Sequence, residues 1–291
     1  MAKNVILKIS QKGAKKTTKA LSKVSSGLVG IGKSAALVTG GLGVLSVKLA
    51  GDFQKSLLEV STLMKFENKN SLNSALRDMS KELRSVAAES GLALGSLSKA
   101  KYDIVSAGFS SAAESAQVLE TSAKLAVGGV TSAAEAADLL TTSLNAFGLQ
   151  AKDSQAVADT LFTTVRLGKT TMGELAGSFG RVLPFAKSMN LSLNDVGAAM
   201  ATMTAAGINT AESTTALVGA VNALSAPGDS AAKAMSDAGI GVKRFDDGTV
   251  DLISTISQFR GLNPDEIKAF IPNIRAIASI QTMANNFEGL K

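Results

Sequence analysis

The chain has 291 residues, of which 45% are hydrophobic, enough for a sizeable core, but only 4% are aromatic and none is tryptophan. It contains no cysteine and no histidine, which excludes disulfides, thiolate catalysis and Ser-His-Asp or Cys-His sites. The formal net charge of +6 is uneven, because the first 50 residues hold nine lysines and no acidic residue. A basic arm therefore precedes a nearly neutral body.

The lysines of the arm recur at spacings of three and four residues, which places them on one face of a helix. Such a face could bind the phosphates of DNA or of anionic lipid. No aromatic residue interleaves the lysines to stack on bases, so a solvated arm that packs against an acidic protein surface explains them equally well. The lysines concerned are Lys12, Lys15, Lys16, Lys19 and Lys23.

An apolar, glycine-rich stretch follows at residues 34–47. It is shorter than the roughly 20 residues that span a bilayer, and its extension back to residue 27 includes Lys33. We interpret residues 27–50 as a helix that packs in an oligomer, or as a conditional membrane segment. A secretory signal is disfavoured by the long basic lead and by Lys48 at the position where cleavage needs a small residue. A membrane-active channel or pore-former thus remains an alternative function.

Residues 27–34 match the phosphate-loop pattern GxxxxGK[ST], with Gly27, Gly32, Lys33 and Ser34 at the defining positions. That loop requires a buried strand immediately before it, and residues 19–26 contain no run of β-branched apolar residues. The glycines that follow would also weaken the required helix. Nucleotide binding is therefore the weaker alternative function.

From residue 51 onward the sequence predicts about a dozen short helices. Hydroxyl residues followed three positions later by an acid predict helix starts at Ser111 with Glu114, Ser132 with Glu135, Thr171 with Glu174 and Ser192 with Asp195. Left-handed glycines are expected to end helices at Gly108, Gly128, Gly148, Gly168 and Gly207. The first four glycines are 20 residues apart, the length of one helix and a short turn, which predicts that consecutive helices run antiparallel.

Apolar residues at helical spacing predict the buried faces. These are Leu119, Ala123 and Ala126; Leu139, Leu140, Leu144 and Phe147; and Val157, Leu161 and Val165.

One segment departs from the helical pattern. In residues 240–250, Asp247 and Gly248 lie between short alternating segments, which predicts a small β-hairpin. Asp246 and Asp247 lack further ligands at calcium-loop spacing, so the pair indicates a turn rather than a metal site. Pro264 and Pro272 then lie near expected helix starts.

The sequence therefore predicts an all-α fold: a multi-helix array of short antiparallel helices with one small β-hairpin near residues 240–250, preceded by a basic and apolar N-terminal helix. We divide it into residues 1–50, the basic arm with the apolar glycine-rich helix, and residues 51–291, the helical core. We expect no enzymatic activity and assign no catalytic, cofactor-binding or metal-binding residue.

Several segments, in this order, resemble the core of the phage tail tape measure (minor tail) protein family. They are AGDFQKSLLEV at 50–60, SAGFSSAAES at 106–115, AAEAADLLTTSLNAFGL at 133–149, VADTL at 157–161, MTAAGINTAES at 203–213, the turn at 247–248 and the final helix at 274–290. The segment at 133–149 is the most specific, and the resemblance extends over about five-sixths of the chain.

The resemblance implies a structural protein of the virion that lies in the lumen of the tail tube, nucleates tail assembly, sets tail length and is released during genome ejection. It would be made in the host cytoplasm. Its implied partners are the tail tube protein, tail-tip or baseplate hub proteins, tail assembly chaperones, further copies of itself, and the host membrane during ejection. Members of the family are usually far longer, so we expect this chain to be a fragment or the core alone, with most of the ruler elsewhere.

Overall fold

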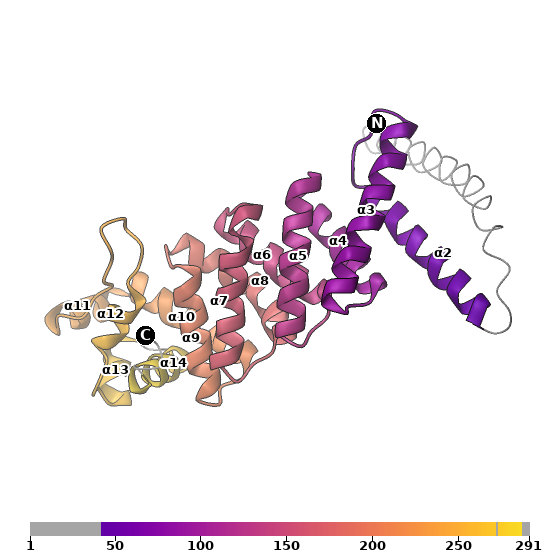
Figure 1. The fold of residues 1–291 in the computed structure, drawn as a ribbon. Helices are drawn as coiled ribbons and strands as arrows, with labels where there is room; N and C mark the ends of the chain where they lie inside the picture. Colours follow the sequence, from indigo (N-terminus) through magenta and orange to yellow (C-terminus); the bar gives the residue numbers. More distant parts are fainter. Residues whose placement is uncertain (1–41, 272, 287–291) are drawn as a thin grey trace, which may run out of the picture. The chain divides into compact units, whose positions relative to one another are not determined.

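The structure is a computed structural model that describes residues 42–271 and 273–286. Throughout this part of the chain the regular secondary structure is helical, which confirms the all-α prediction (Figure 1). The helices are α2 (Leu42–Ser61), α3 (Lys69–Ser90), α4 (Leu94–Ser106), α5 (Ala112–Gly128), α6 (Ala133–Phe147), the 3-10 turn η2 (Ala151–Asp153), α7 (Ser154–Leu167), α8 (Met172–Ser188), α9 (Leu193–Ala205), α10 (Thr210–Ser225), α11 (Asp229–Asp237), α12 (Leu252–Ser257), α13 (Pro264–Phe270) and α14 (Ile274–Asn285).

The chain divides into two compact units, Met1–Lys55 and Ser56–Lys291. Of the first unit, the structure describes only residues 42–55, which form the first part of α2. The boundary predicted at residue 50 falls inside α2, and the separate basic arm lies almost entirely outside the described residues. The predicted division into residues 1–50 and 51–291 therefore stays a prediction.

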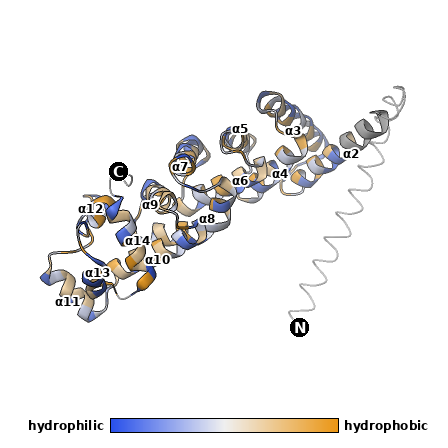
Figure 2. Cartoon of the chain, turned by 90° about the horizontal axis from the view of Figure 1, so that it is seen from below, coloured by the Kyte–Doolittle hydropathy of each residue, from blue (hydrophilic) through white to orange (hydrophobic). Residues whose placement is uncertain are grey.

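The second unit is built from two layers of helices. Helices α4, α6, α8 and α10 pack side by side in one layer, and α14 packs against α10. Helices α3, α5, α7 and α9 form the other layer (Figure 2). Successive helices of the first layer begin at residues 94, 133, 172 and 210, so one unit of two helices occupies about 39 residues.

Two hydrogen bonds show the direction of the helices. The backbone N–H of Ala133, at the start of α6, donates to Ser96 Oγ in the first turn of α4 at 3.1 Å. At the other end, Asn145 Nδ2 in α6 donates to the carbonyl oxygen of Ala107, which follows α4, at 2.9 Å. Helices α4 and α6 are therefore parallel. Because α5 connects them through short turns and packs on both, consecutive helices run antiparallel, as predicted.

The predicted helix starts are correct, with one difference in detail. Ser132, Thr171 and Ser192 each form a complete capping box with the acidic residue three positions later. Ser111 Oγ accepts a hydrogen bond from the Glu114 N–H, but the Glu114 carboxylate accepts from the Ser111 hydroxyl instead of its backbone. In each case a polar side chain satisfies a backbone N–H that the helix itself leaves without a partner.

Helices end at or close to all five predicted glycines, but only three of these glycines are left-handed. Gly108, Gly148 and Gly207 have φ values of 107°, 67° and 97°. The predicted left-handed conformation is wrong at Gly128, which is still the last residue of α5, and at Gly168, which directly follows α7 with a φ of −91°. A Cβ on Gly168 would lie 2.5 Å from Thr204 Oγ1 and 3.0 Å from Ala201 Cα. Glycine is therefore needed there because α7 and α9 approach closely.

The core consists mainly of small aliphatic side chains. Eight of the ten residues predicted for the three faces are buried, while Phe147 and Val165 are only half-buried. Aromatic packing is confined to a few positions, such as Phe259 and Phe270, whose ring centroids lie 6.5 Å apart at an interplanar angle of 74°. The helices are therefore held together by many contacts between aliphatic side chains, each of which buries little area, and not by one large aromatic cluster.

The predicted β-hairpin is wrong. A turn at Asp247 and Gly248 is present, but it is flanked by a single isolated bridge between Arg244 and Val250. The neighbouring backbone groups have other partners, because the Val250 N–H donates to the carbonyl of Asn190. Thr255 Oγ1 in α12 accepts from the Lys243 N–H, and the side chain of Gln258, which directly follows α12, bonds both backbone groups of Gly241. These bonds occupy backbone groups that a longer ladder would need.

The C-terminal helices agree with the sequence in part. Pro264 is the first residue of α13, as expected. Pro272 and residues 287–291 lie outside the described residues, so the helix expected at 274–290 is described only as α14.

Candidate functional site

The sequence motifs that suggested small-ligand chemistry give no site in the described part of the chain. Gly27, Gly32, Lys33 and Ser34 lie outside it. Asp246 and Asp247 are exposed in the turn, and residues 42–271 and 273–286 contain no group of three or more acidic residues arranged to hold a metal ion. The features that remain are polar contacts between helices and the solvent-facing surface.

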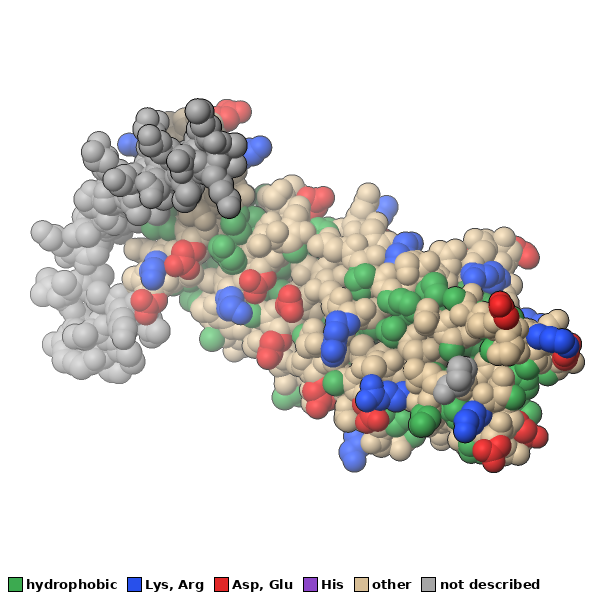
Figure 3. Space-filling view, turned by 180° about the vertical axis from the view of Figure 1, so that it is seen from behind, with side chains coloured by type: hydrophobic (Ala, Val, Ile, Leu, Met, Phe, Trp, Pro, Cys, Tyr) green, Lys and Arg blue, Asp and Glu red, His purple; other side chains and the backbone are tan. Residues whose placement is uncertain are grey.

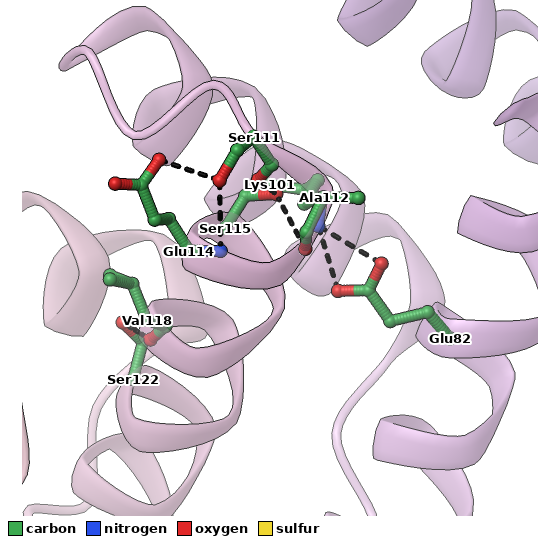
Figure 4. A network of polar contacts seen from close by, with 8 residues as sticks. All are labelled: Glu82, Lys101, Ser111, Ala112, Glu114, Ser115, Val118 and Ser122. Atoms are coloured by element: carbon green, nitrogen blue, oxygen red, sulfur yellow. Dashed lines mark hydrogen bonds and ion pairs between the residues drawn. The ribbon is translucent and has the colours of Figure 1, made fainter. Parts of the chain in front are cut away.

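The most buried charged group is Lys101 of α4. Its side chain is 1% exposed, and Nζ lies 2.7 and 2.9 Å from the two carboxylate oxygens of Glu82 in α3 (Figure 4). Burial lowers the pKa of Lys101, and the neighbouring Glu82 carboxylate partly opposes that effect. A bidentate ion pair thus joins the first two helices of the array.

Sequence analysis missed Lys101, although a signal was present. Lys101 follows Leu97 by four residues and precedes Ile104 by three, so it lies on the buried face of α4. A lysine in the middle of an apolar stripe needs a partner, and Glu82 supplies it. The start of α5 lies beside this pair, where Ser115 Oγ donates to the carbonyl of Ser111 at 2.7 Å (Figure 4).

A second polar feature is the row of helix N-termini in the first layer. Hydrogen bonds from the Thr131 and Ser132 hydroxyls and the Ser132 N–H lower the pKa of Glu135 at the start of α6. At the start of α8, hydrogen bonds from Thr170 and Thr210 lower the pKa of Glu174. These carboxylates also face the positive ends of their helices.

Glu174 links two helices as well as capping one. Thr210 is the first residue of α10. Its Oγ1 donates to Glu174 Oε2 at 3.1 Å and lies 2.6 Å from Thr170 Oγ1. On the preceding helix, Glu135 Oε1 lies 3.7 Å from the Cβ position of Gly173. The capping groups therefore form a continuous edge along α6, α8 and α10.

Two shallow clefts open beside α4. The larger, about 560 Å³, is lined mainly by polar residues of α2 and α4, including Ser56, Lys99 and Tyr102. The smaller, about 230 Å³, lies between α4 and α6, and Asp103 lines both. Burial raises the pKa of Asp103, Lys99 lowers it and Asp138 raises it further.

Charged side chains of both signs are interspersed over the face shown in Figure 3, with hydrophobic side chains in small groups between them. Large hydrophobic residues that remain exposed include Leu63, Tyr102, Val127, Val130, Phe162, Leu167, Phe245 and Ile274. They are dispersed along the chain, in turns, near helix ends and, at Tyr102 and Phe162, inside helices. This surface suits contacts with other proteins more than the binding of a small molecule.

The membrane hypothesis concerned residues 27–50. Residues 42–50 form the start of α2, and residues 27–41 are not described. Over the part of the chain that was searched, none of the helices combines the length and the hydropathy needed to cross a bilayer.

Comparison with known proteins gives a consistent result. Residues 73–283 match the family described as phage-related minor tail protein. A probable tape measure protein of Clostridium phage phiCD119 is 30% identical over 172 residues, which cover 56% of this chain and 17% of the relative. The tape measure protein of Pneumococcus phage Dp-1 is 24% identical over 251 residues, 84% of this chain and 21% of the relative. This chain thus spans about a fifth of the length of these relatives. No solved structure matches it significantly.

Proposed function

This chain belongs to the phage-related minor tail protein family, and from that premise we propose that it is the folded core of a tape measure protein. It is a structural component of the phage tail. The proposed core lies in the lumen of the tail tube, nucleates tail assembly around a longer measuring chain, and leaves the tail during genome ejection.

The alignment with the tape measure protein of phage Dp-1 carries this proposal. It extends over 84% of the chain, including the helices of both layers, so the likeness concerns the whole array rather than one motif. The alternatives, a channel formed by residues 27–50 and a phosphate loop with Lys33, gain no support from these relatives. Both relatives are named as tape measure proteins.

The geometry suits a scaffold better than a catalyst. Lys101 and Glu82 join α3 to α4, and Glu174 and Thr210 join α8 to α10, so these polar side chains hold helices together. The proposed partners are the tail tube protein, tail-tip or hub proteins, assembly chaperones and further copies. The interspersed charges and dispersed apolar residues on the surface support protein contacts of this kind.

Because these 291 residues contain no cysteine, a cysteine introduced into them can be followed in its own proteolytic peptide, which allows a direct test of the location. We would place a single cysteine at exposed Ser85 in the phage gene and treat intact virions with a maleimide that carries a large polymer. If the core lies inside the tube, Ser85→Cys stays unmodified in intact virions and reacts after ejection is triggered. Equal modification before and after ejection would contradict a lumenal location.

Ser122→Cys provides the matched control, because Ser122 is fully buried in α5. In a folded core this cysteine stays unmodified both in virions and after release. Modification of Ser122→Cys on release would show that the array unfolds as it leaves the tube. The pair of variants therefore separates location from unfolding.

Nucleation and measurement are tested by deletion. A measuring helix loses about 1.5 Å of length per residue removed, so a deletion of 39 residues in such a segment shortens the tail by roughly 60 Å. We expect instead that removal of residues 133–171, one unit of the array, abolishes tails, because it breaks contacts in both layers. Shorter but regular tails in electron micrographs would show that this region measures.

A further inference from the structure

Helix α8 occupies the centre of the first layer but has a sequence that is poorly suited to a helix. Gly177, Gly180 and Pro184 lie inside it at spacings of three and four residues, and all three are exposed on the same side. The opposite side is fully buried, with Leu175, Phe179 and other apolar residues at 0% exposure.

Packing does not explain the two glycines. A Cβ at Gly177 or Gly180 would meet no atom within 4 Å, and neither residue has a positive φ. Elsewhere in the array the reason for a glycine is visible. At Gly197 in α9, for example, a Cβ would lie 2.5 Å from Thr164 Oγ1. Alanine would fit at Gly177 and Gly180 without any movement of neighbouring atoms.

These residues weaken the helix itself. An interior glycine lowers the equilibrium constant for helix formation about fivefold relative to alanine, which is about 1 kcal/mol. Pro184 has no N–H to donate to the carbonyl of Gly180, four residues earlier, and its ring crowds that carbonyl. Residues 177–184 therefore hold a helical conformation mainly because their buried side packs against neighbouring helices.

Those neighbours lie on both sides of α8. Helix α8 packs extensively on α6 and on α10, whereas α6 and α10 do not pack directly on each other. Loss of the helical conformation in α8 would thus separate the preceding helices of this layer from the following ones. A weak element at this place affects the whole array.

We propose that α8 is a built-in opening point of the array, at which the first layer separates into two parts before the rest of the helices unfold. The opening is a partial unfolding that exposes the buried side of residues 175–186 while the other helices keep their backbone hydrogen bonds. This inference concerns the folded chain alone and does not depend on its proposed place in the tail.

Native-state hydrogen exchange of the full chain, followed by mass spectrometry of peptides, tests the proposal. We expect backbone amides in α8 to exchange about tenfold faster than those of α6, which packs beside it in the same layer and contains no interior glycine or proline. The double variant Gly177→Ala with Gly180→Ala should slow exchange in α8 about 25-fold and leave α5 and α6 nearly unchanged. Pro184→Ala should slow it as well, because it restores a donor to the Gly180 carbonyl.

Gly219→Ala is the matched control. Gly219 is interior to α10, and its Cβ position lies at an ordinary 3.8 Å from Ala276 Cβ. This variant should slow exchange in α10 but leave α8 unchanged. The proposal is overturned if α8 is as protected as α6 in the wild type, or if the α8 variants slow exchange equally in all helices, since exchange would then require global unfolding.

Discussion

Lys101 Nζ and the Glu82 carboxylate form a bidentate ion pair across α3 and α4, with N–O distances of 2.7 and 2.9 Å. The two partners differ in burial, since the Lys101 side chain is 1% exposed and that of Glu82 is 23% exposed. Loss of Glu82 would leave a buried cation without compensation, whereas loss of Lys101 would leave a carboxylate that water can reach. The pair is therefore asymmetric in its contribution to folding.

This asymmetry predicts the result of two substitutions. Glu82→Ala should lower the free energy of unfolding by about 3 kcal/mol, because Lys101 must then lose its charge or pull α4 open. Lys101→Met keeps the length of the side chain and should change it by less than about 1.5 kcal/mol. Urea denaturation followed by circular dichroism measures both. Equal losses in the two variants would show that the ion pair itself, and not the buried cation, determines the stability.

Glu174 makes stability depend on acid pH. Hydrogen bonds from Thr170 and, to a smaller extent, from Thr210 lower the pKa of the Glu174 carboxyl from its usual 4.5. The carboxylate therefore stabilises the fold above pH 4.5, and this contribution is lost as the pH falls through the lower pKa of the folded state. Glu174→Gln should destabilise the array at pH 7 by about 0.5 kcal/mol, a small amount because the carboxylate is exposed to solvent. The difference between variant and wild type should shrink below about pH 4.5 in urea titrations. A difference that grows on acidification would contradict this assignment.

Gly168 tests the close approach of α7 and α9. A Cβ there would lie 2.5 Å from Thr204 Oγ1, 2.8 Å from the Thr164 carbonyl oxygen and 3.0 Å from Ala201 Cα. Because two of these atoms belong to the backbone, Gly168→Ala should lower the free energy of unfolding by about 2–3 kcal/mol. Thermal melts of this variant and of Gly219→Ala, which creates no overlap, provide the comparison. A Gly168→Ala protein as stable as the wild type would show that the two helices can move apart freely.

Val130 is left-handed, with a φ of 51°, and 92% exposed, so a β-branched residue holds a strained conformation without any packing gain. Val130→Gly should raise the free energy of unfolding by about 0.5–1 kcal/mol, because the strain exceeds the entropy that glycine loses. Melting temperatures measure this effect.

Asn190 is the natural comparison. In the described part of the chain it is the other residue that is left-handed without being a glycine, with a φ of 58°. Asparagine tolerates that conformation, and its Nδ2 donates to the carbonyl of Gly248 at 3.3 Å. Asn190→Gly should therefore lower stability slightly. A gain in both variants would mean that φ alone, and not the side chain, determines the effect.

Local chemistry explains which features could be predicted. Ser132, Thr171 and Ser192 were recognisable as helix starts because a capping box needs only residues three positions apart. Gly148 was recognisable as a left-handed helix end for the same reason. The left-handed conformation predicted for Gly168 is wrong, because the close approach of α9 is what requires a glycine there. The hairpin predicted at residues 240–250 is wrong as well, because Asn190 and Thr255 of α12 bind backbone groups that it would have used.

The sequence by itself determined the helical class, several helix starts and ends, and the alternating direction of the helices, because backbone hydrogen bonds, caps and the period of apolar residues act within a few residues. Only the tertiary structure decided that alternate helices align in two layers, that Lys101 finds Glu82 nineteen residues away, and that α8 depends on its neighbours for its conformation. These relationships join residues that are distant in the chain. They follow from the packing of complementary surfaces, which no local pattern of residues specifies.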